Sequence, residues 1–294
     1  MPALFFNLPI MIMDARNHEL LSARAEFYLC LARAFAAPTD PLMLPALRDV
    51  LADDLGELAA ELGYAIETPL SRYRDEVLRV TDATHLLQIY SAIFLAPPTP
   101  ARINVGMYID GAMNGGSVKA MEEAYLQCGV ERDESFRDLS DHVTVQLEFV
   151  ALLYARQAAY FTGDSAAEPL PVDPGHFLHD HARRWLGPLC ADLARAASER
   201  ELDANPYLPL AQILSAAAAC DAVAPEVDAK AAQKRHAIES ARAKVAARGI
   251  TAQDMAEIKR KLEARGLSTD HLSVPLELRD GAMGLGKRST PGPR

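Results

Sequence analysis

Apolar residues recur at helical spacing through most of this sequence, and prolines interrupt the pattern at intervals. The intervals between successive apolar residues are three or four positions in one clear example, which contains Leu44, Leu47, Leu51, Leu55 and Leu58. This spacing places the side chains on one face of a helix. Runs in which Val, Ile or Thr alternate with polar residues, the pattern of a β-strand, are scarce. The pattern predicts an all-α protein built as a single compact, bundle-like helical domain.

The positions of the breaks predict the individual elements. We expect helices at residues 16–37, 41–62, 70–80, 83–94, 117–128, 141–161, 175–197 and 207–220. The glycine-rich stretch at 103–116 predicts a structured loop instead. Beyond Pro225 the composition becomes polar and basic, and two further helices are expected at 230–248 and 251–265. The predicted division is an N-terminal arm at 1–15, a helical domain at 16–222, and a basic helical extension at 226–294 with a disordered tail.

Charge is divided unevenly between the helical body and the extension. Residues 1–225 hold 31 acidic and 16 basic side chains, a net charge of −15, whereas residues 226–294 hold 9 acidic and 14 basic ones, a net charge of +5. A body of this charge repels nucleic acid and attracts a cationic partner. The apolar stretch from Leu4 to Met13 is short, contains Pro9 and has no basic segment before it. We therefore expect no nucleic-acid binding, no stable membrane insertion and a cytoplasmic protein.

The residues that could bind a metal do not form a convincing ligand set. The four cysteines stand far apart, so we expect small buried side chains rather than zinc or redox ligands. His176, His179, Asp180 and His181 lie within six residues of one another. His176 and His179 could share a helix face and hold a metal, but His181 would point elsewhere, which favours a polar helix entry.

A second candidate for a catalytic site is the sequence Ser140-Asp141-His142, at the start of the long apolar segment at 141–161. An aspartate could orient an imidazole for base catalysis, but adjacent residues do not normally make that hydrogen bond side chain to side chain. The better interpretation is that Ser140 or Asp141 caps the helix. Nucleophile motifs, phosphate loops and dinucleotide fingerprints are missing from the sequence. We therefore expect a protein that is not an enzyme and uses no cofactor.

Three motifs, in order along the chain, resemble those of the TorD/DmsD family of chaperones for redox enzymes. Tyr90-Ser-Ala-Ile-Phe94 is similar to an aromatic-x-x-Leu-Phe motif. Asp138-Leu-Ser-Asp141-His142 is similar to an acid-Pro-x-Asp-His motif, with leucine in place of proline and aspartate in place of glutamate. Glu148-Phe149, followed by Phe177-Leu-x-x-His181-x-x-x-Trp185, is similar to a third stretch. The resemblance covers roughly residues 16–220 and leaves the basic extension unexplained.

This resemblance implies a chaperone that binds the N-terminal, twin-arginine signal region of the catalytic subunit of a molybdenum-containing redox enzyme. It would bind the signal peptide and the apo-protein, and hold them in the cytoplasm until the molybdenum cofactor is inserted. Such a peptide has a basic part and an apolar part, which an acidic groove with an apolar floor would suit. The residues implied in peptide binding are Tyr90, Phe94, Asp138, Asp141, His142, Glu148, His181 and Trp185. We expect Asp141 and His142 to lie on an exposed edge where a helix begins.

Two other functions are compatible with the sequence at this point. One is a metal-dependent enzyme that uses the histidine-rich helix together with His142. The other is a helical adaptor that acts through the basic segment after Pro225. The sequence is equally compatible with a monomer and with a homodimer, and it does not identify the redox enzyme that is served.

Overall fold

The computed structural model describes residues 8–131, 138–161, 170–224 and Arg260. All regular structure within these residues is helical, and one isolated antiparallel bridge pairs Asn104 with His142. The all-α prediction is therefore confirmed for the described part of the chain. The helices expected at 230–248 and 251–265 lie outside the described residues, apart from Arg260.

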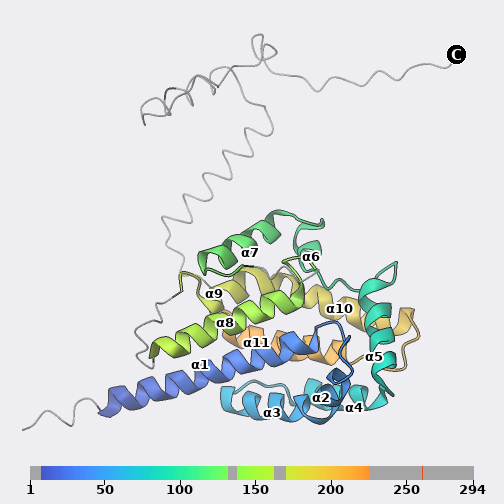
Figure 1. Cartoon of the computed structure of the whole chain (residues 1–294), viewed down its shortest axis with the longest axis horizontal. Helices are drawn as coiled ribbons and strands as arrows, with labels where there is room; N and C mark the ends of the chain where they lie inside the picture. The colour runs from blue at the N-terminus through green and yellow to red at the C-terminus, as the bar shows by residue number, and fades with distance from the viewer. Residues whose placement is uncertain (1–7, 132–137, 162–169, 225–259, 261–294) are drawn as a thin grey trace, which may run out of the picture. The chain divides into compact units, whose positions relative to one another are not determined.

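The elements follow one another in an order that matches most of the expected segments (Figure 1). They are α1 (Leu8–Ala34), α2 (Met43–Asp49), α3 (Leu51–Leu62), α4 (Glu67–Arg79), α5 (Ala83–Tyr90), the π-helical turn η1 (Ser91–Leu95), α6 (Gly106–Asp110), α7 (Gly116–Gln127), α8 (Val143–Phe161), α9 (Pro174–Phe177), the π-helical turn η2 (Leu178–Ala182), α10 (Arg183–Glu199) and α11 (Tyr207–Asp221).

Three boundaries differ from the expectation, each for a local reason. Helix α1 begins at Leu8, inside the expected N-terminal arm. Pro9 does not interrupt it, because in the first turn a missing N–H costs no helical hydrogen bond. The segment at 41–62 is divided at Val50, whose φ of −124° and ψ of −51° interrupt the helix. The glycine-rich stretch contains a short helix, α6, rather than only a loop.

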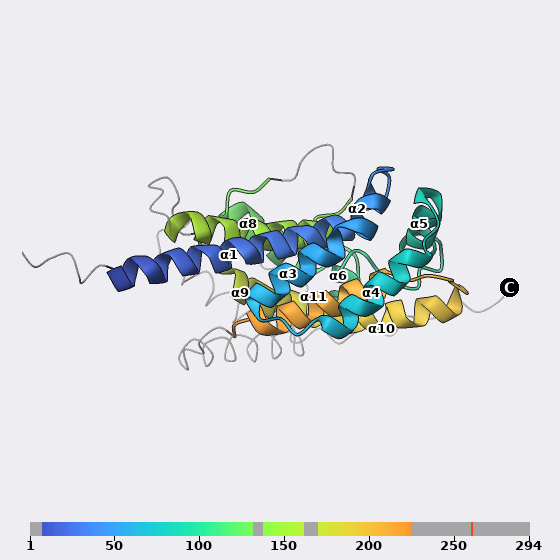
Figure 2. The ribbon, with the colours of Figure 1, turned by 90° about the horizontal axis from the view of Figure 1, so that it is seen from below.

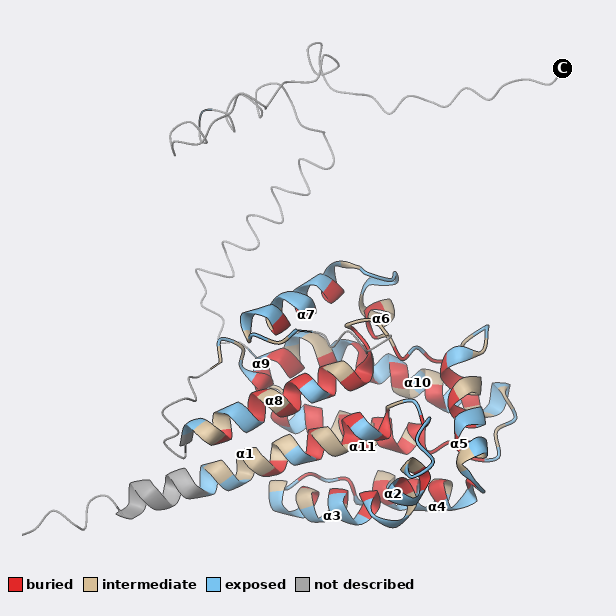
Figure 3. Ribbon diagram, viewed as in Figure 1, coloured by how far each residue is buried: buried red, intermediate tan, exposed pale blue. Residues whose placement is uncertain are grey.

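Helices α1 and α8 lie side by side along most of their length and form the main pair of the fold. Figure 2 shows this pair on one side, with α10 and α11 on the other. Residues coloured as buried in Figure 3 are concentrated on the parts of these helices that pack against one another. The largest fully buried ones are aromatic, namely Trp185, Tyr28, Tyr73, Tyr90, Tyr207, Phe27 and Phe35. Burying each large apolar side chain contributes about 1.5–3 kcal/mol, so these aromatic residues contribute a large share of the stability.

A buried carboxylate joins the end of α11 to this main pair. Asp221 accepts hydrogen bonds from Arg24 Nε at 3.0 Å, from the Tyr28 hydroxyl at 3.0 Å, and from the Tyr64 hydroxyl. The guanidinium of Arg24 lies over the ring of Tyr154 on α8, 5.9 Å from its centroid. Burial is the main cause of the raised pKa values of Tyr28 and Tyr64, and the charge of Asp221 adds to it. One side chain therefore holds α1, α8, α11 and the turn after α3 together.

The chain divides into two units, Met1–Pro225 and Glu226–Arg294. The elements α1 to α11 all belong to the first unit, and Arg260 is the described residue of the second. Among the described helices, none combines the length and the apolar character that crossing a bilayer requires.

Candidate functional site

Asp141 lies at a buried junction between the start of α8 and the segment before α6. The Val105 N–H donates to the Asp141 carbonyl at 3.0 Å, and the Val143 N–H donates to the Ile103 carbonyl at 3.0 Å. The Asp141 carboxylate accepts the Gly106 N–H at 2.8 Å. Its side chain therefore accepts a hydrogen bond from the first residue of α6. The expectation that Asp141 caps its own helix is wrong, because α8 begins at Val143.

His142 is the second residue of this junction. Its Nδ1 accepts the Thr144 N–H at 3.1 Å, so the proton of the neutral ring is on Nε2, which lies 3.8 Å from a carboxylate oxygen of Asp138. Burial lowers the pKa of His142, while the charges of Asp138 and Asp141 oppose this shift. The expected exposed edge is wrong: Asp141 is 1% exposed and His142 is 4% exposed, because the segment at 103–106 covers them.

The aromatic motif residues Tyr90, Phe94 and Trp185 are buried in the core. The Trp185 indole donates to the Gln146 side chain at 3.2 Å, and that side chain donates to the Asp141 carbonyl at 3.3 Å. Tyr90 is buried, and burial together with the charge of Asp138 raises its pKa to about 12. The rings of Tyr90 and Phe94 pack against each other and against Tyr207. Each of the three motifs therefore contributes buried side chains, and Asp138, which lies beside His142, is partly exposed.

The last two predicted site residues have other neighbours. His181 packs against Phe177, with ring centroids 4.6 Å apart, and burial lowers its pKa. Glu148 is exposed on the outer face of α8, and its pKa is raised by partial burial. Glu148 is the predicted site residue that lines a cavity next to α1.

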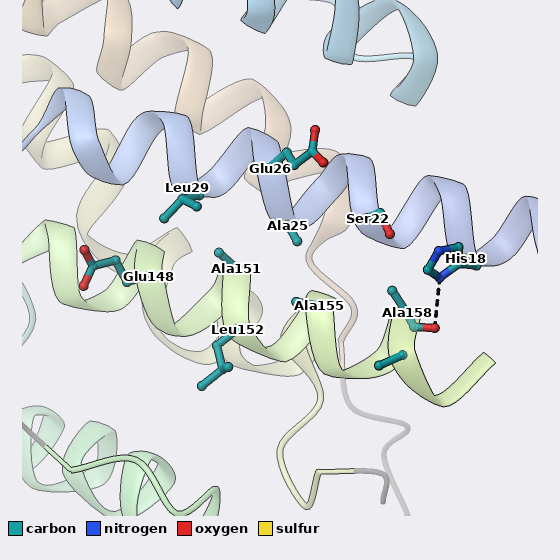
Figure 4. Close-up of a pocket in the computed structure, with 11 residues that line it drawn as sticks. His18, Ser22, Ala25, Glu26, Leu29, Glu148, Ala151, Leu152, Ala155 and Ala158 are labelled. Atoms are coloured by element: carbon teal, nitrogen blue, oxygen red, sulfur yellow. Dashed lines mark hydrogen bonds between the residues drawn. The ribbon is translucent and has the colours of Figure 1, made fainter. Parts of the chain in front are cut away.

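The cavity is an open groove of about 590 Å³ between α1 and α8 (Figure 4). Its lining is mostly small or aliphatic, with Leu29 on α1 and Leu152 on α8 among the larger side chains. The alanines that line it are Ala25, Ala151, Ala155, Ala158 and Ala159. Since these side chains are short, the backbones of α1 and α8 leave room between their outer faces. A peptide with an apolar face fits such a lining without burying unpaired polar groups.

Polar groups lie at both ends of this groove. Glu148 lines the end near Leu29, whereas His18 lines the opposite end and donates to the Ala158 carbonyl at 3.0 Å (Figure 4). Glu26 lies on α1 between them. The sequence interpretation missed all of the α1 residues of the groove. The available signal was the repeat of alanines at helical spacing on one face of α8, beginning at Ala151.

The described residues offer no set of three or more His, Cys, Asp or Glu side chains placed to hold a metal ion. His179 Nδ1 lies 3.0 Å from Asp180, and His176 Nδ1 lies 3.8 Å from Asp173, so the two imidazoles have different carboxylate neighbours. The expectation of four buried cysteines is wrong for Cys220, which is exposed. Cys30, Cys128 and Cys190 are partly buried.

Residues 48–191 match the family model of the nitrate reductase delta subunit. Over these residues, just under half of the chain, the sequence is similar to that family. It is a family of chaperones for the maturation of molybdenum-containing respiratory enzymes, as the resemblance to TorD/DmsD proteins implied. The match is shorter than the resemblance, because it leaves out α1 and α11. It does include the residues around Asp141. Comparison with curated proteins gives no match.

The buried His142 predicts a stability that falls in mild acid. Because the pKa of His142 in the folded protein is lowered, the unfolded chain takes up a proton below pH about 6.5 that the folded protein resists. The free energy of unfolding should therefore decrease as the pH falls through this range. Urea titrations at several pH values, for the wild type and His142→Gln, measure it. His142→Gln should show a shallower decrease, and identical slopes would contradict the assignment.

Proposed function

We propose that this chain binds the N-terminal signal region of the catalytic subunit of a molybdenum-containing redox enzyme. It acts before export, in the cytoplasm, while the cofactor is inserted into the apo-protein. The match to the family model supports the chaperone role. The observation that carries the binding step is the α1–α8 groove, which combines an apolar lining with the carboxylates Glu26 and Glu148.

The chemistry of the groove fits the two parts of such a ligand. An apolar segment, folded as a helix, would bury its side chains against the alanines and Leu152, which is the usual way in which an amphipathic helix binds a groove. Basic side chains beside that segment would be attracted by Glu26, Glu148 and the net charge of −15 of the body. Among the predicted site residues, we assign ligand contact to Glu148. The buried residues Asp141, His142 and Trp185 are assigned a positioning role, because they fix the start of α8.

Filling the groove should abolish most of the binding. Ala155 is exposed on α8 and lines the groove, so Ala155→Trp places a large ring in the ligand's path without disturbing the core. The probe is a labelled peptide of roughly 15 residues, long enough to form a helix, with two arginines followed by alanines and leucines. We expect its affinity, measured by fluorescence anisotropy, to fall by about tenfold or more, which corresponds to at least about 1.4 kcal/mol.

The matched control is Ala191→Trp, which places the same ring on an exposed alanine of α10, away from the groove. This variant should bind the peptide as the wild type does. Equal affinities for both variants and the wild type would show that the peptide binds elsewhere.

A further inference from the structure

A second depression lies on the other side of α1 from the α1–α8 groove. A cleft of about 400 Å³ lies between α1 and α3, and Glu26 and Leu29 line both cavities. Figure 1 shows α1 between α8 and α3, so these two residues lie on the ridge that separates groove and cleft. A ligand seated in the groove can therefore reach the cleft by crossing a single helix.

The lining changes from mostly apolar in the groove to acidic in the cleft. On the α3 side the cleft is lined by the exposed carboxylates Asp54, Glu57 and Glu61. None of the three, nor Glu26, forms an ion pair with the described residues, and Arg33 is the cation among the lining side chains. Several unpaired carboxylates close together repel one another, and a bound cationic segment would relieve that repulsion.

We propose that the peptide crosses α1 at Glu26, with its apolar segment in the α1–α8 groove and its cationic residues in the α1–α3 cleft. This inference rests on the proposed function and adds to it the place where the basic side chains bind and the direction of the ligand. A ligand that lay along α1 would bring its basic residues either to His18 at one end of the groove or to Glu148 at the other, and neither end has a group of carboxylates comparable to that of the cleft. Charge complementarity therefore selects the crossing path.

Two changes on α3 test the path. The double variant Glu57→Gln, Glu61→Gln removes two charges from the cleft and leaves the groove untouched. The control, Glu67→Gln with Glu123→Gln, removes two exposed charges on α4 and α7 and has the same net charge. The probes are the arginine-containing peptide described above and the same peptide with glutamines in place of its arginines.

We expect the cleft variant to bind the arginine peptide about threefold to tenfold more weakly than the control variant, the range for two partly exposed charge pairs. The difference should shrink as salt is added. Binding of the glutamine peptide should be equal in both variants, since it uses only the groove. Arg33→Gln should have the opposite effect and strengthen binding of the arginine peptide, because it removes a repelling charge from the cleft.

The outcomes separate this inference from the proposed function. If Ala155→Trp abolishes binding of both peptides but the cleft variant binds the arginine peptide as the control does, the groove is the binding site and the crossing path is wrong. If Arg33→Gln weakens binding of the arginine peptide, the path is also wrong. If neither peptide binds the wild type, both the proposed function and the path fail.

Discussion

Asp221→Ala is expected to lower the free energy of unfolding by about 3–5 kcal/mol, the range for breaking a buried, hydrogen-bonded charge pair. The carboxylate is almost fully buried and accepts hydrogen bonds from three side chains. Its removal leaves the hydroxyls of Tyr28 and Tyr64 without an acceptor in the core, and each such loss costs about 1–3 kcal/mol. Arg24 loses least, because its partly exposed guanidinium can turn to water. Since small domains are stable by about 5–15 kcal/mol in total, this change should be severe.

Single hydroxyl deletions provide the matched comparison. Tyr28→Phe removes one donor but leaves the carboxylate its bonds to Arg24 and Tyr64, so we expect a loss of about 1 kcal/mol. In urea titrations the losses for Asp221→Ala and Tyr28→Phe should not add in the double variant, because both act on the same hydrogen bond. Full additivity, or a loss below about 1 kcal/mol for Asp221→Ala, would contradict the role of this residue as the link between α1 and α11.

The helical part of the fold could be predicted because its causes are local. Apolar spacing gave α8 and α11 to within a few residues, and the single helix expected at 175–197 corresponds to α9, η2 and α10 together. The prolines at 97 and 98 marked the end of a helical segment. The break at Val50 could not be predicted. No proline or glycine stands there, and the leucine repeat runs through it without a change of spacing. The two π-helical turns also leave no local signal, since the residues of η1 and η2 suit an ordinary helix equally well.

The candidate site was predicted only in part, because it depends on contacts between distant residues. Polar residues before a helix usually lie at the surface, and the sequence gives no indication that Asp141 has the Gly106 N–H as its partner. The groove requires α1 and α8 to pack side by side, and no short motif in the sequence predicts that packing. Glu148 entered the predicted site through its place in a motif. Its role as a lining residue could be recognised only when Glu26 and Leu29 were found on the neighbouring helix.

The buried junction predicts a second large effect, for Asp141→Ala. This change removes the acceptor of the Gly106 N–H and one contact of the Asn104 amide, at 2.8 and 3.4 Å. A buried backbone N–H without a partner costs about 1–3 kcal/mol, and the start of α6 loses its only side-chain acceptor among the described residues. We expect a loss of about 2–3 kcal/mol. Asp141→Asn keeps an oxygen at the same place and should cost about half as much.

A glycine in the same junction allows a coupled test. A side chain at Gly106 would place its Cβ 2.6 Å from Val118 Cγ2 and 2.7 Å from an Asp141 carboxylate oxygen, so Gly106→Ala should cost about 1–3 kcal/mol through overpacking. In the double variant with Asp141→Ala, one of the two clashes disappears. The combined loss should therefore be smaller than the sum of the single losses by about 0.5 kcal/mol or more.

Trp185 provides the measurement for this pair of changes. It is the single tryptophan of the chain and is fully buried, so its fluorescence in urea titrations reports unfolding. Its indole is connected through Gln146 to the Asp141 carbonyl, which stays in place in every variant. We therefore expect the folded-state emission to remain that of a buried indole while the midpoint falls. Strict additivity of the two losses, or a loss below about 0.5 kcal/mol for Asp141→Ala, would show that the Asp141 carboxylate does not hold the start of α6.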